Sequence, residues 1–200
     1  MTAPHGLETE RAKQVRMIVL DVDGVLTDAS LYYGAEGEAL KRFSARDGFA
    51  IKLAQSQGIH VAILSGRLAP PLQARLKDLG ICDQRVIQGS RDKGRDIELL
   101  AEREGVPLEH IAFMGDDLPD LPALARVGVS ACPADAAPEV RERCRLVTGA
   151  AGGQGAVREL IETLLKARGE WDEIVAKWAG GTPPGSFYDS FERDHGADTK

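Results

Sequence analysis

Short apolar runs alternate with amphipathic segments along most of the chain. The run MIVL at 17–20 is partly β-branched and stops at acids and a glycine, which is typical of a strand buried on both faces of a sheet. Further runs of this kind occur at 59–64, 110–114 and 129–132, and a shorter one lies within ICDQRVIQG at 81–89. The pattern therefore predicts a series of buried strands, of which 17–20 is the first and the central one.

Segments with apolar residues at helical spacing separate these strands. A helix is predicted from a capping Asp47 to a stop at Gly58, and others are predicted at 68–80, 92–105 and 118–128. Strands joined by single helices predict a doubly wound, Rossmann-like α/β fold, with a mostly parallel sheet and helices on both faces. In such folds functional groups gather beyond the carboxyl ends of the strands.

Two parts of the chain depart from this alternation. SLYYGAEGEALKRF, at 30–43, has β-forming residues on both sides of the turn-rich GAEGE and predicts a β-hairpin inserted after the first strand. After the flexible AGGQG, residues 156–178 are expected to be helical. Residues 180–200 are rich in glycine, proline and polar residues, and we expect them to form a disordered tail.

Composition and charge narrow the possible partners. The 200 residues, 43% of them hydrophobic, suffice for one domain with a real core and some appendages. With 25 Lys and Arg against 31 Asp and Glu, the net charge is -6, so we expect neither nucleic acid nor a membrane as a partner. Three cysteines without CxxC spacing, and no apolar run that fits a signal or a membrane span, favour a soluble cytoplasmic protein.

Acidic residues follow two of the predicted strands. Asp21 and Asp23 come directly after 17–20, and Asp116, Asp117 and Asp120 come directly after 110–114. Carboxylates gathered at one edge repel each other unless a hard divalent cation such as Mg²⁺, which prefers oxygen ligands, compensates them. The alternatives are an ordinary polar turn at the first pair and helix capping by Asp117 or Asp120 at the second group.

Residues suited to phosphate binding lie between the two acidic groups. Ser65, Gly66 and Arg67 end the strand IHVAIL, and Lys93 begins a helix. A hydroxyl and exposed backbone N–H groups hold phosphate oxygens, and a lysine supplies positive charge. The alternatives are a simple Ser-Gly turn and a solvated lysine, but the position of each residue at the end of a strand or helix favours a site.

In this order, DVDGVLTD, LSGR, DKG and GDDLPD resemble the four motifs of the haloacid dehalogenase superfamily, whose phosphatases form an aspartyl-phosphate intermediate. The resemblance implies that Asp21 is the nucleophile and Asp23 the general acid and base. It also implies that Ser65 and Lys93 hold the phosphate. Mg²⁺ would be bound by the side chains of Asp21 and Asp116 and by the backbone carbonyl of Asp23.

Two further acids, Asp117 and Asp120, would support the metal ligands without binding the ion directly. The resemblance implies supporting roles for Asp117 and for Asp120, the latter through a bound water or by orienting Lys93. It covers the catalytic domain, expected at 16–168, and leaves an N-terminal extension at 1–15 and a helix end with the tail at 169–200. Larger members of the superfamily carry a cap domain over the site, but the spacing of the motifs here leaves no room for one.

A capless site would be open to water, which weakens every electrostatic interaction within it. Neighbouring subunits could close it, because the edges of the predicted hairpin at 30–43 are free to pair with those of sister chains. The stretch DVDGVLTDASLYYGAEGEALKRFSARDG, together with GDDLPDLP and GGQGAVRE, is similar to the capless, tetrameric 3-deoxy-D-manno-octulosonate 8-phosphate phosphatases. The resemblance therefore implies a homotetramer, although the hairpin could also be a simple surface feature.

The same resemblance implies the substrate. It would be an acidic eight-carbon sugar phosphate, hydrolysed in the biosynthesis of lipopolysaccharide precursors. Gly66 would contact this substrate, and the planar guanidinium groups of Arg67 and Arg75 could bind its carboxylate. A solvated helix face is an equal alternative for Arg75.

Other readings of the sequence remain open. Related phosphatases of nine-carbon, sialic-type acids tend to carry an acidic residue in the place of Arg67, so Arg67 favours the octulosonate. A signalling receiver domain has a similar fold and acid pairs, but its lysine follows its acids, whereas Lys93 precedes Asp116. An inactive scaffold is a further alternative, and the complete set of motifs disfavours it.

Overall fold

The computed structural model describes residues 9–181. The predicted disordered tail lies almost entirely outside the described residues, as do the first eight residues of the chain. In chain order the elements are α1 (Thr9–Lys13), β1 (Met17–Leu20), β2 (Tyr32–Gly34), β3 (Gly37–Leu40), α2 (Ala45–Ser56), β4 (His60–Ser65), α3 (Pro70–Asp78), η1 (Asp83–Arg85), β5 (Val86–Gln88), α4 (Lys93–Glu104), η2 (Leu108–His110), β6 (Ile111–Met114), η3 (Leu118–Asp120), α5 (Leu121–Leu124), β7 (Val129–Cys132), α6 (Pro138–Arg141), β8 (Leu146–Val147), α7 (Ala156–Ala167) and α8 (Trp171–Ala179).

A parallel sheet forms the centre of the molecule, with its strands in the order β5-β4-β1-β6-β7-β8. Strand β1 lies between β4 and β6, and Leu20 is level with Ile63 on one side and Met114 on the other. This topology confirms the predicted doubly wound α/β fold and the central place of β1. The short strand β8 was not predicted. Because β1, β4 and β6 are parallel neighbours, their carboxyl ends lie together at one edge of the sheet.

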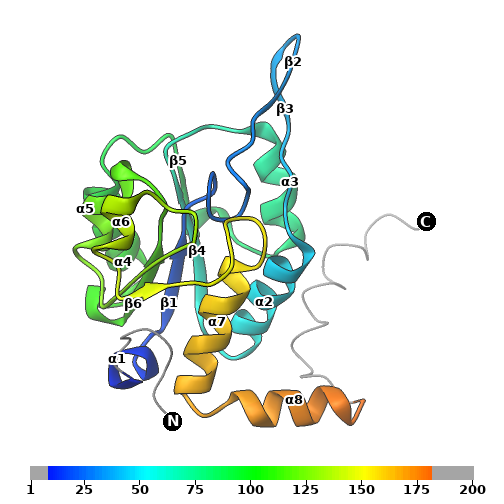
Figure 1. The fold of residues 1–200 in the computed structure, drawn as a ribbon, viewed down its shortest axis with the longest axis vertical. Coiled ribbons are helices and arrows are strands. Elements are labelled where there is room, and N and C mark those ends of the chain that lie inside the picture. The colour runs from blue at the N-terminus through cyan, green and yellow to red at the C-terminus, as the bar shows by residue number, and fades with distance from the viewer. Residues whose placement is uncertain (1–8, 182–200) are drawn as a thin grey trace.

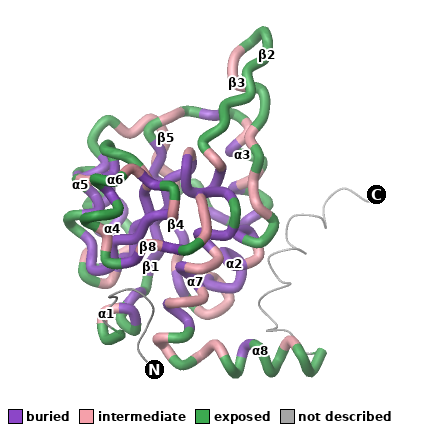
Figure 2. The backbone as a smooth tube through the Cα atoms, in the orientation of Figure 1, coloured by how far each residue is buried: buried purple, intermediate pink, exposed green. Residues whose placement is uncertain are grey.

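Each face of the sheet packs against its own set of helices, as the predicted pattern requires. Ile18 and Leu20 of β1 belong to a core that includes residues of α2, α3 and α7. Met17 and Val19, which point the other way, belong to a second core with residues of α4, α5 and α6. Figure 1 shows these two layers on opposite sides of the sheet, and Figure 2 shows that β1 and most of β4, at the centre of the sheet, are buried between them.

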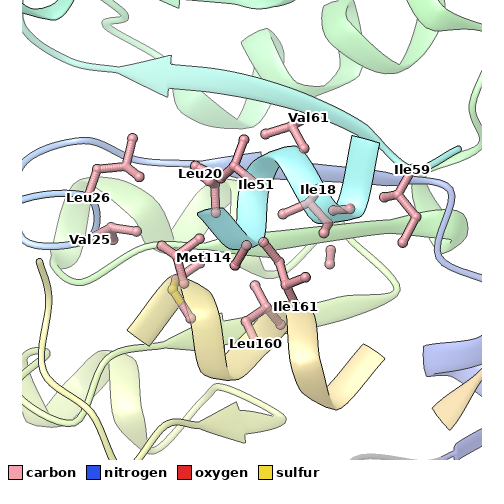
Figure 3. Packing of buried hydrophobic residues seen from close by; sticks show 14 of the residues in the cluster. Ile18, Leu20, Val25, Leu26, Ile51, Ile59, Val61, Met114, Leu160 and Ile161 are labelled. Atoms are coloured by element: carbon pink, nitrogen blue, oxygen red, sulfur yellow. The ribbon is translucent and has the colours of Figure 1, made fainter. Parts of the chain in front are cut away.

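The loop after β1 is anchored in the first of these cores. Val25 and Leu26 are at most 3% exposed. They pack in the same cluster as Met114 of β6 and Leu160 of α7, as Figure 3 shows. The segment that carries Asp23 is therefore fixed by hydrophobic burial at its distal end.

The predicted hairpin is confirmed. Strands β2 and β3 form a separate two-stranded antiparallel sheet, with Gly34 paired to Gly37 across the turn. The hairpin projects from the body of the molecule (Figure 1). No helix within residues 9–181 is long and apolar enough to cross a membrane.

Three helix boundaries differ from the prediction. Helix α2 begins after Ser44, whose hydroxyl accepts a hydrogen bond from the Asp47 amide, so Asp47 is not the cap. The segment predicted as one helix at 118–128 forms the short η3 and a single turn, α5. A proline is tolerated only in the first turn of a helix, so Pro119 and Pro122 each begin a short element and prevent one continuous helix. The helical stretch from 156 breaks at Gly169, where φ is +76°, and gives α7 and α8.

Candidate active site

The two acidic groups meet at the carboxyl ends of β1 and β6. The Asp21 amide donates to the carbonyl of Met114 at 3.0 Å, which continues the pairing of the two strands into the site. Gly24, the residue that follows Asp23, has φ +84°, and a Cβ built on it would lie 2.0 Å from Oδ2 of Asp116. The loop after β1 therefore lies directly against the Asp116 carboxylate, and only glycine leaves room for that contact.

Three carboxylates converge at this edge. Asp21, Asp116 and Asp120 each offer an oxygen, and these atoms lie within 4.8 Å of one another. Asp21 and Asp120 are buried and Asp116 is half-buried. Asp120 is held by the start of η3, where its Oδ2 accepts from the amides of Asp116 at 2.9 Å and Asp117 at 3.2 Å. Asp117 itself caps η3 by accepting from the Leu118 amide at 2.8 Å.

Lys93 supplies the positive charge within this cluster. It begins α4 and is only 6% exposed. Its ammonium donates to Oδ1 of Asp120 at 2.6 Å and pairs with Oδ2 of Asp21 at 2.9 Å. Asp92 caps the same helix through the Arg95 amide at 3.0 Å, which fixes the turn that carries Lys93. The solvated alternative for this lysine is therefore wrong.

The proximity of these charges changes their protonation. Burial, followed by the repulsion of Asp120, raises the pKa of Asp21 to about 7. Burial and the neighbouring carboxylates, first Asp21 and then Asp120, raise the pKa of Asp116 to about 8. Burial of Lys93 opposes its charge, but the attraction of Asp21 and Asp120 outweighs this and raises its pKa.

The cluster has the composition of a site for a hard cation. Its three carboxylates exceed its single ammonium in charge, and the raised pKa of Asp116 shows that the excess is unfavourable when no cation compensates it. Both oxygens of Asp120 are already engaged by Lys93 and by backbone amides. Asp21 and Asp116 therefore have the oxygens most available to Mg²⁺, and their chemistry fits that ion.

Ser65 and Gly66 lie at the carboxyl end of β4, beside β1. Ser65 is 2% exposed, and its carbonyl accepts from the Ser90 amide at 3.0 Å. Its Oγ lies 3.3 Å from both the amide and the carbonyl of Arg67, so the hydroxyl also organises a local turn. The topology thus brings this turn to the same edge of the sheet as Asp21, while the phosphate-binding role of Ser65 stays a prediction.

Asp23 lies in a different charge group from Asp21. The chain leaves β1 at Leu20 and bends at Val22, between the two acids. The carboxylate of Asp23 instead accepts a hydrogen bond from Lys41, which directly follows β3, and its Oδ2 lies 3.5 Å from Nε of Arg67. Glu38 of β3 pairs with both cations, with Lys41 at 2.6 Å and Arg67 at 2.9 Å.

Lys41 and Glu38 were not identified from the sequence. Nothing in the spacing of LKRF places a lysine against an acid that lies 18 positions earlier in the chain. Their spacing of three residues was the only available signal, and it is common in surface pairs.

Arg75 is engaged elsewhere. Its guanidinium donates to Asp78 at 2.6 Å and to the Ser44 carbonyl at 3.2 Å, and it lies 5.8 Å from the centre of the Phe43 ring. These contacts tie α3 to the start of α2. The predicted role of Arg75 in substrate binding has no support in this arrangement, whereas Arg67 lies beside Asp23.

The fold and the acidic edge of the sheet define a haloacid dehalogenase-like hydrolase, and residues 32–128 match the family model of that description. The chain is 42% identical over 171 residues to the 3-deoxy-D-manno-octulosonate 8-phosphate phosphatase KdsC of Salmonella typhimurium, which covers 86% of this chain and 89% of the relative. It is 43% identical over 163 residues to KdsC of Escherichia coli K12, and this alignment covers 82% of this chain and 86% of the relative. The chain therefore belongs to the family of 3-deoxy-D-manno-octulosonate 8-phosphate phosphatases.

Solved structures agree with this assignment. The cobalt-bound phosphatase of Haemophilus influenzae is 41% identical with a TM-score of 0.78, covering 80% of this chain and 93% of that one. The Moraxella catarrhalis phosphatase, solved with a magnesium ion, a phosphate ion and a KDO molecule, is 35% identical with a TM-score of 0.81, covering 85% and 97%.

Proposed function

We propose that this chain is a Mg²⁺-dependent phosphatase that hydrolyses 3-deoxy-D-manno-octulosonate 8-phosphate to the free sugar acid and phosphate. The observation that carries the proposal is the contact of buried Lys93 with Asp21, within a carboxylate cluster that includes Asp116. This arrangement combines a nucleophile, a cation site and a phosphate-binding charge. The named relatives act on this substrate class and support the choice of sugar.

In the first step, an oxygen of Asp21 attacks phosphorus in line with the leaving oxygen. The bond from phosphorus to Asp21 forms as the bond to the sugar oxygen breaks, and Asp23 donates a proton to that oxygen. Lys93 and the Ser65 hydroxyl stabilise the charge on the equatorial oxygens. Asp21 and Asp116 would hold Mg²⁺, which would supply positive charge to screen the repulsion between carboxylate and phosphate.

In the second step, water attacks the phosphorus of the aspartyl phosphate. Asp23, now deprotonated, takes a proton from this water, and the bond between Asp21 and phosphorus breaks. The enzyme is thereby returned to its starting state. Arg67 lies beside Asp23, and we assign it to the carboxylate of the sugar acid because its side chain is 39% exposed and carries the positive charge that a carboxylate requires. We assign Gly66, which follows Ser65 at the end of β4, to substrate contact as well.

We also propose that the enzyme is a cytoplasmic homotetramer assembled through its hairpins. Large apolar side chains are exposed on or beside the hairpin, including Leu31 at 44%, Tyr33 at 65% and Leu40 at 65%. An exposed apolar patch of this kind on a projecting two-stranded sheet is suited to burial against sister chains.

The activity is tested by measuring phosphate release from a panel of eight-carbon and nine-carbon acidic sugar phosphates, with and without Mg²⁺. We expect turnover of the octulosonate 8-phosphate only when Mg²⁺ is present. A preference for a nine-carbon, sialic-type substrate would instead support the second candidate, which Arg67 disfavours.

The nucleophile is tested with Asp21→Asn. This change should reduce kcat by at least ~1,000-fold, because the amide cannot form the acyl phosphate. The fold should persist, since Asn removes a buried charge whose pKa is already raised to about 7 by burial and by Asp120. Undiminished turnover in a folded Asp21→Asn protein would rule out the nucleophile assignment.

A further inference from the structure

Lys41 is a buried lysine outside the cluster of Asp21, Asp116 and Asp120. It directly follows β3, at the base of the hairpin, and its side chain is 1% exposed. Its ammonium donates to Oδ1 of Asp23 and pairs with Oε1 of Glu38 at 2.6 Å. A buried ammonium is strongly unfavourable unless carboxylates compensate it, so this placement requires both partners.

The next residue, Arg42, forms an exposed ion pair that also connects the hairpin to the body of the molecule. Arg42 pairs with Asp28 at 2.8 Å, and its side chain is 61% exposed. That contact already ties the base of the hairpin to the loop after β1. Attachment alone therefore does not explain why Lys41 is buried against Asp23.

Together, four side chains form a neutral arrangement of alternating charge: Asp23, Lys41, Glu38 and Arg67. Burial of Glu38 opposes its charge, yet Lys41 and Arg67 hold its pKa below the usual range, so Glu38 is ionised. Arg67 donates to Oε2 of Glu38 at 2.9 Å, which leaves Oε1 to Lys41. Glu38 in this way fixes the position of the lysine that contacts Asp23.

The two carboxylate oxygens of Asp23 have different contacts with Lys41 and Arg67. Oδ1 accepts the hydrogen bond from Lys41. Oδ2 lies 3.5 Å from Nε of Arg67, beyond ordinary hydrogen-bond length, and this Nε–H has no hydrogen-bond partner among the described residues. Because an ammonium can only donate, Oδ1 must accept, so a proton carried by this carboxyl group resides on Oδ2.

We propose that Lys41 is a positioning residue that orients Asp23 for proton transfer to the leaving oxygen. It holds Oδ1 and directs Oδ2, with its proton, toward the substrate. This inference rests on the proposed function, in which Asp23 is the general acid. Proton donation requires correct placement of the donor, and a small displacement of the group reduces the rate strongly.

The test compares two esters that differ in their need for a proton. An alkyl ester, the sugar acid 8-phosphate, requires protonation of its leaving oxygen, whereas p-nitrophenyl phosphate releases a stable phenolate. Lys41→Met should lower kcat/KM for the sugar ester by about 100-fold, with KM little changed. For the aryl ester the loss should be less than about fivefold, because its first step needs little acid catalysis.

Three further variants complete the design. Lys41→Arg keeps the donor and should restore most of the activity on the sugar ester. Arg42→Met removes the adjacent exposed cation and should match the wild type on both esters. The double variant of Lys41→Met with Glu38→Gln keeps the group neutral, so it gives the same comparison of esters even where the single variant fails to fold.

Equal losses on the two esters, or a change confined to KM, would overturn the positioning role of Lys41 while leaving the proposed function intact. A wild-type enzyme that releases no phosphate from the sugar ester in Mg²⁺ would overturn the proposed function and this inference with it. The expected result is a loss selective for the alkyl ester that Lys41→Arg reverses.

Discussion

At the scale of single residues, the pKa values of two carboxyl groups in this site, Asp116 and Glu38, are shifted in opposite directions. Asp116 lies among carboxylates, and burial together with the charges of Asp21 and Asp120 raises its pKa to about 8. Glu38 lies between two cations, and its pKa is held low although burial opposes this. The first environment is suited to capturing a cation and the second to holding a fixed ion-pair network.

The raised pKa of Asp116 predicts how the metal-free protein responds to pH. Between the ordinary value of 3.8 and about 8, the folded state keeps a proton that the unfolded state has lost. The free energy of unfolding should therefore fall as pH rises through this range. Mg²⁺ binds the deprotonated site, so it should restore stability at the alkaline end, by about 2.7 kcal/mol at 100 times its Kd.

Thermal melts across this pH range, with and without Mg²⁺, provide the measurement. Asp116→Asn should reduce the pH dependence to the part that comes from Asp21, whose pKa burial also raises, and should abolish the response to Mg²⁺. A wild-type melting temperature that does not change with Mg²⁺ at alkaline pH would contradict a metal site at Asp116.

The residues of the acidic cluster could be predicted from sequence because topology alone brings them together. Asp21 and Asp116 directly follow strands, and parallel strands that are neighbours end at the same edge. Lys41 and Glu38 could not be predicted in this way. Their contacts depend on the orientation of the hairpin relative to the loop after β1. The hydrophobic periodicity of the sequence does not determine that orientation.

At the scale of elements, helix α7 begins without a capping side chain of its own. Its N-cap is Gly155, with φ +114°, in the glycine-rich GGQG segment. The buried carboxylate of Asp47, from the first turn of α2, accepts instead from the amides of Gly155 at 3.2 Å and Arg158 at 2.8 Å. The sequence predicted Asp47 as the cap of its own helix, but Ser44 occupies that place and Asp47 caps a helix more than 100 positions away.

Asp47→Ala should therefore destabilise the protein through α7. Two amide donors would lose their acceptor in a buried position, and we expect a loss of about 1–3 kcal/mol in the free energy of unfolding. Chemical denaturation measures this loss. Glu173→Ala, which removes an exposed carboxylate on α8, should leave the denaturation curve unchanged, and an equal effect of both changes would argue against the capping role of Asp47.

At the scale of the whole molecule, the hairpin stands apart from the central sheet. Its two strands pair only with each other, and an isolated hairpin is marginally stable in water. The charge network at its base holds it to the body, while its tip projects away from the remaining elements (Figure 1). Assembly through this hairpin would bury its exposed apolar side chains.

Replacing Leu31 and Leu40 together by lysine should convert the proposed tetramer to a monomer, because burying the new charges in the interface is unfavourable. Light scattering on the purified protein gives the mass directly. Val175→Lys, at an apolar position on α8 that is 48% exposed, is the matched control and should keep the mass of the wild type. A wild-type mass equal to a single chain would refute the assembly.

The packing of the GGQG segment has a consequence for when the enzyme becomes active during its synthesis. The Gly153 amide donates to the Val25 carbonyl at 2.9 Å, and a Cβ on Gly152 would lie 1.8 Å from the Gly24 carbonyl oxygen. All proposed catalytic groups have been translated by residue 120, yet the loop that carries Asp23 gains this backing only about thirty positions later. While the GGQG segment is still inside the ribosome, the nascent chain already contains every proposed catalytic side chain. It should nevertheless lack turnover, because the loop that carries Asp23 is not yet packed against Gly152 and Gly153.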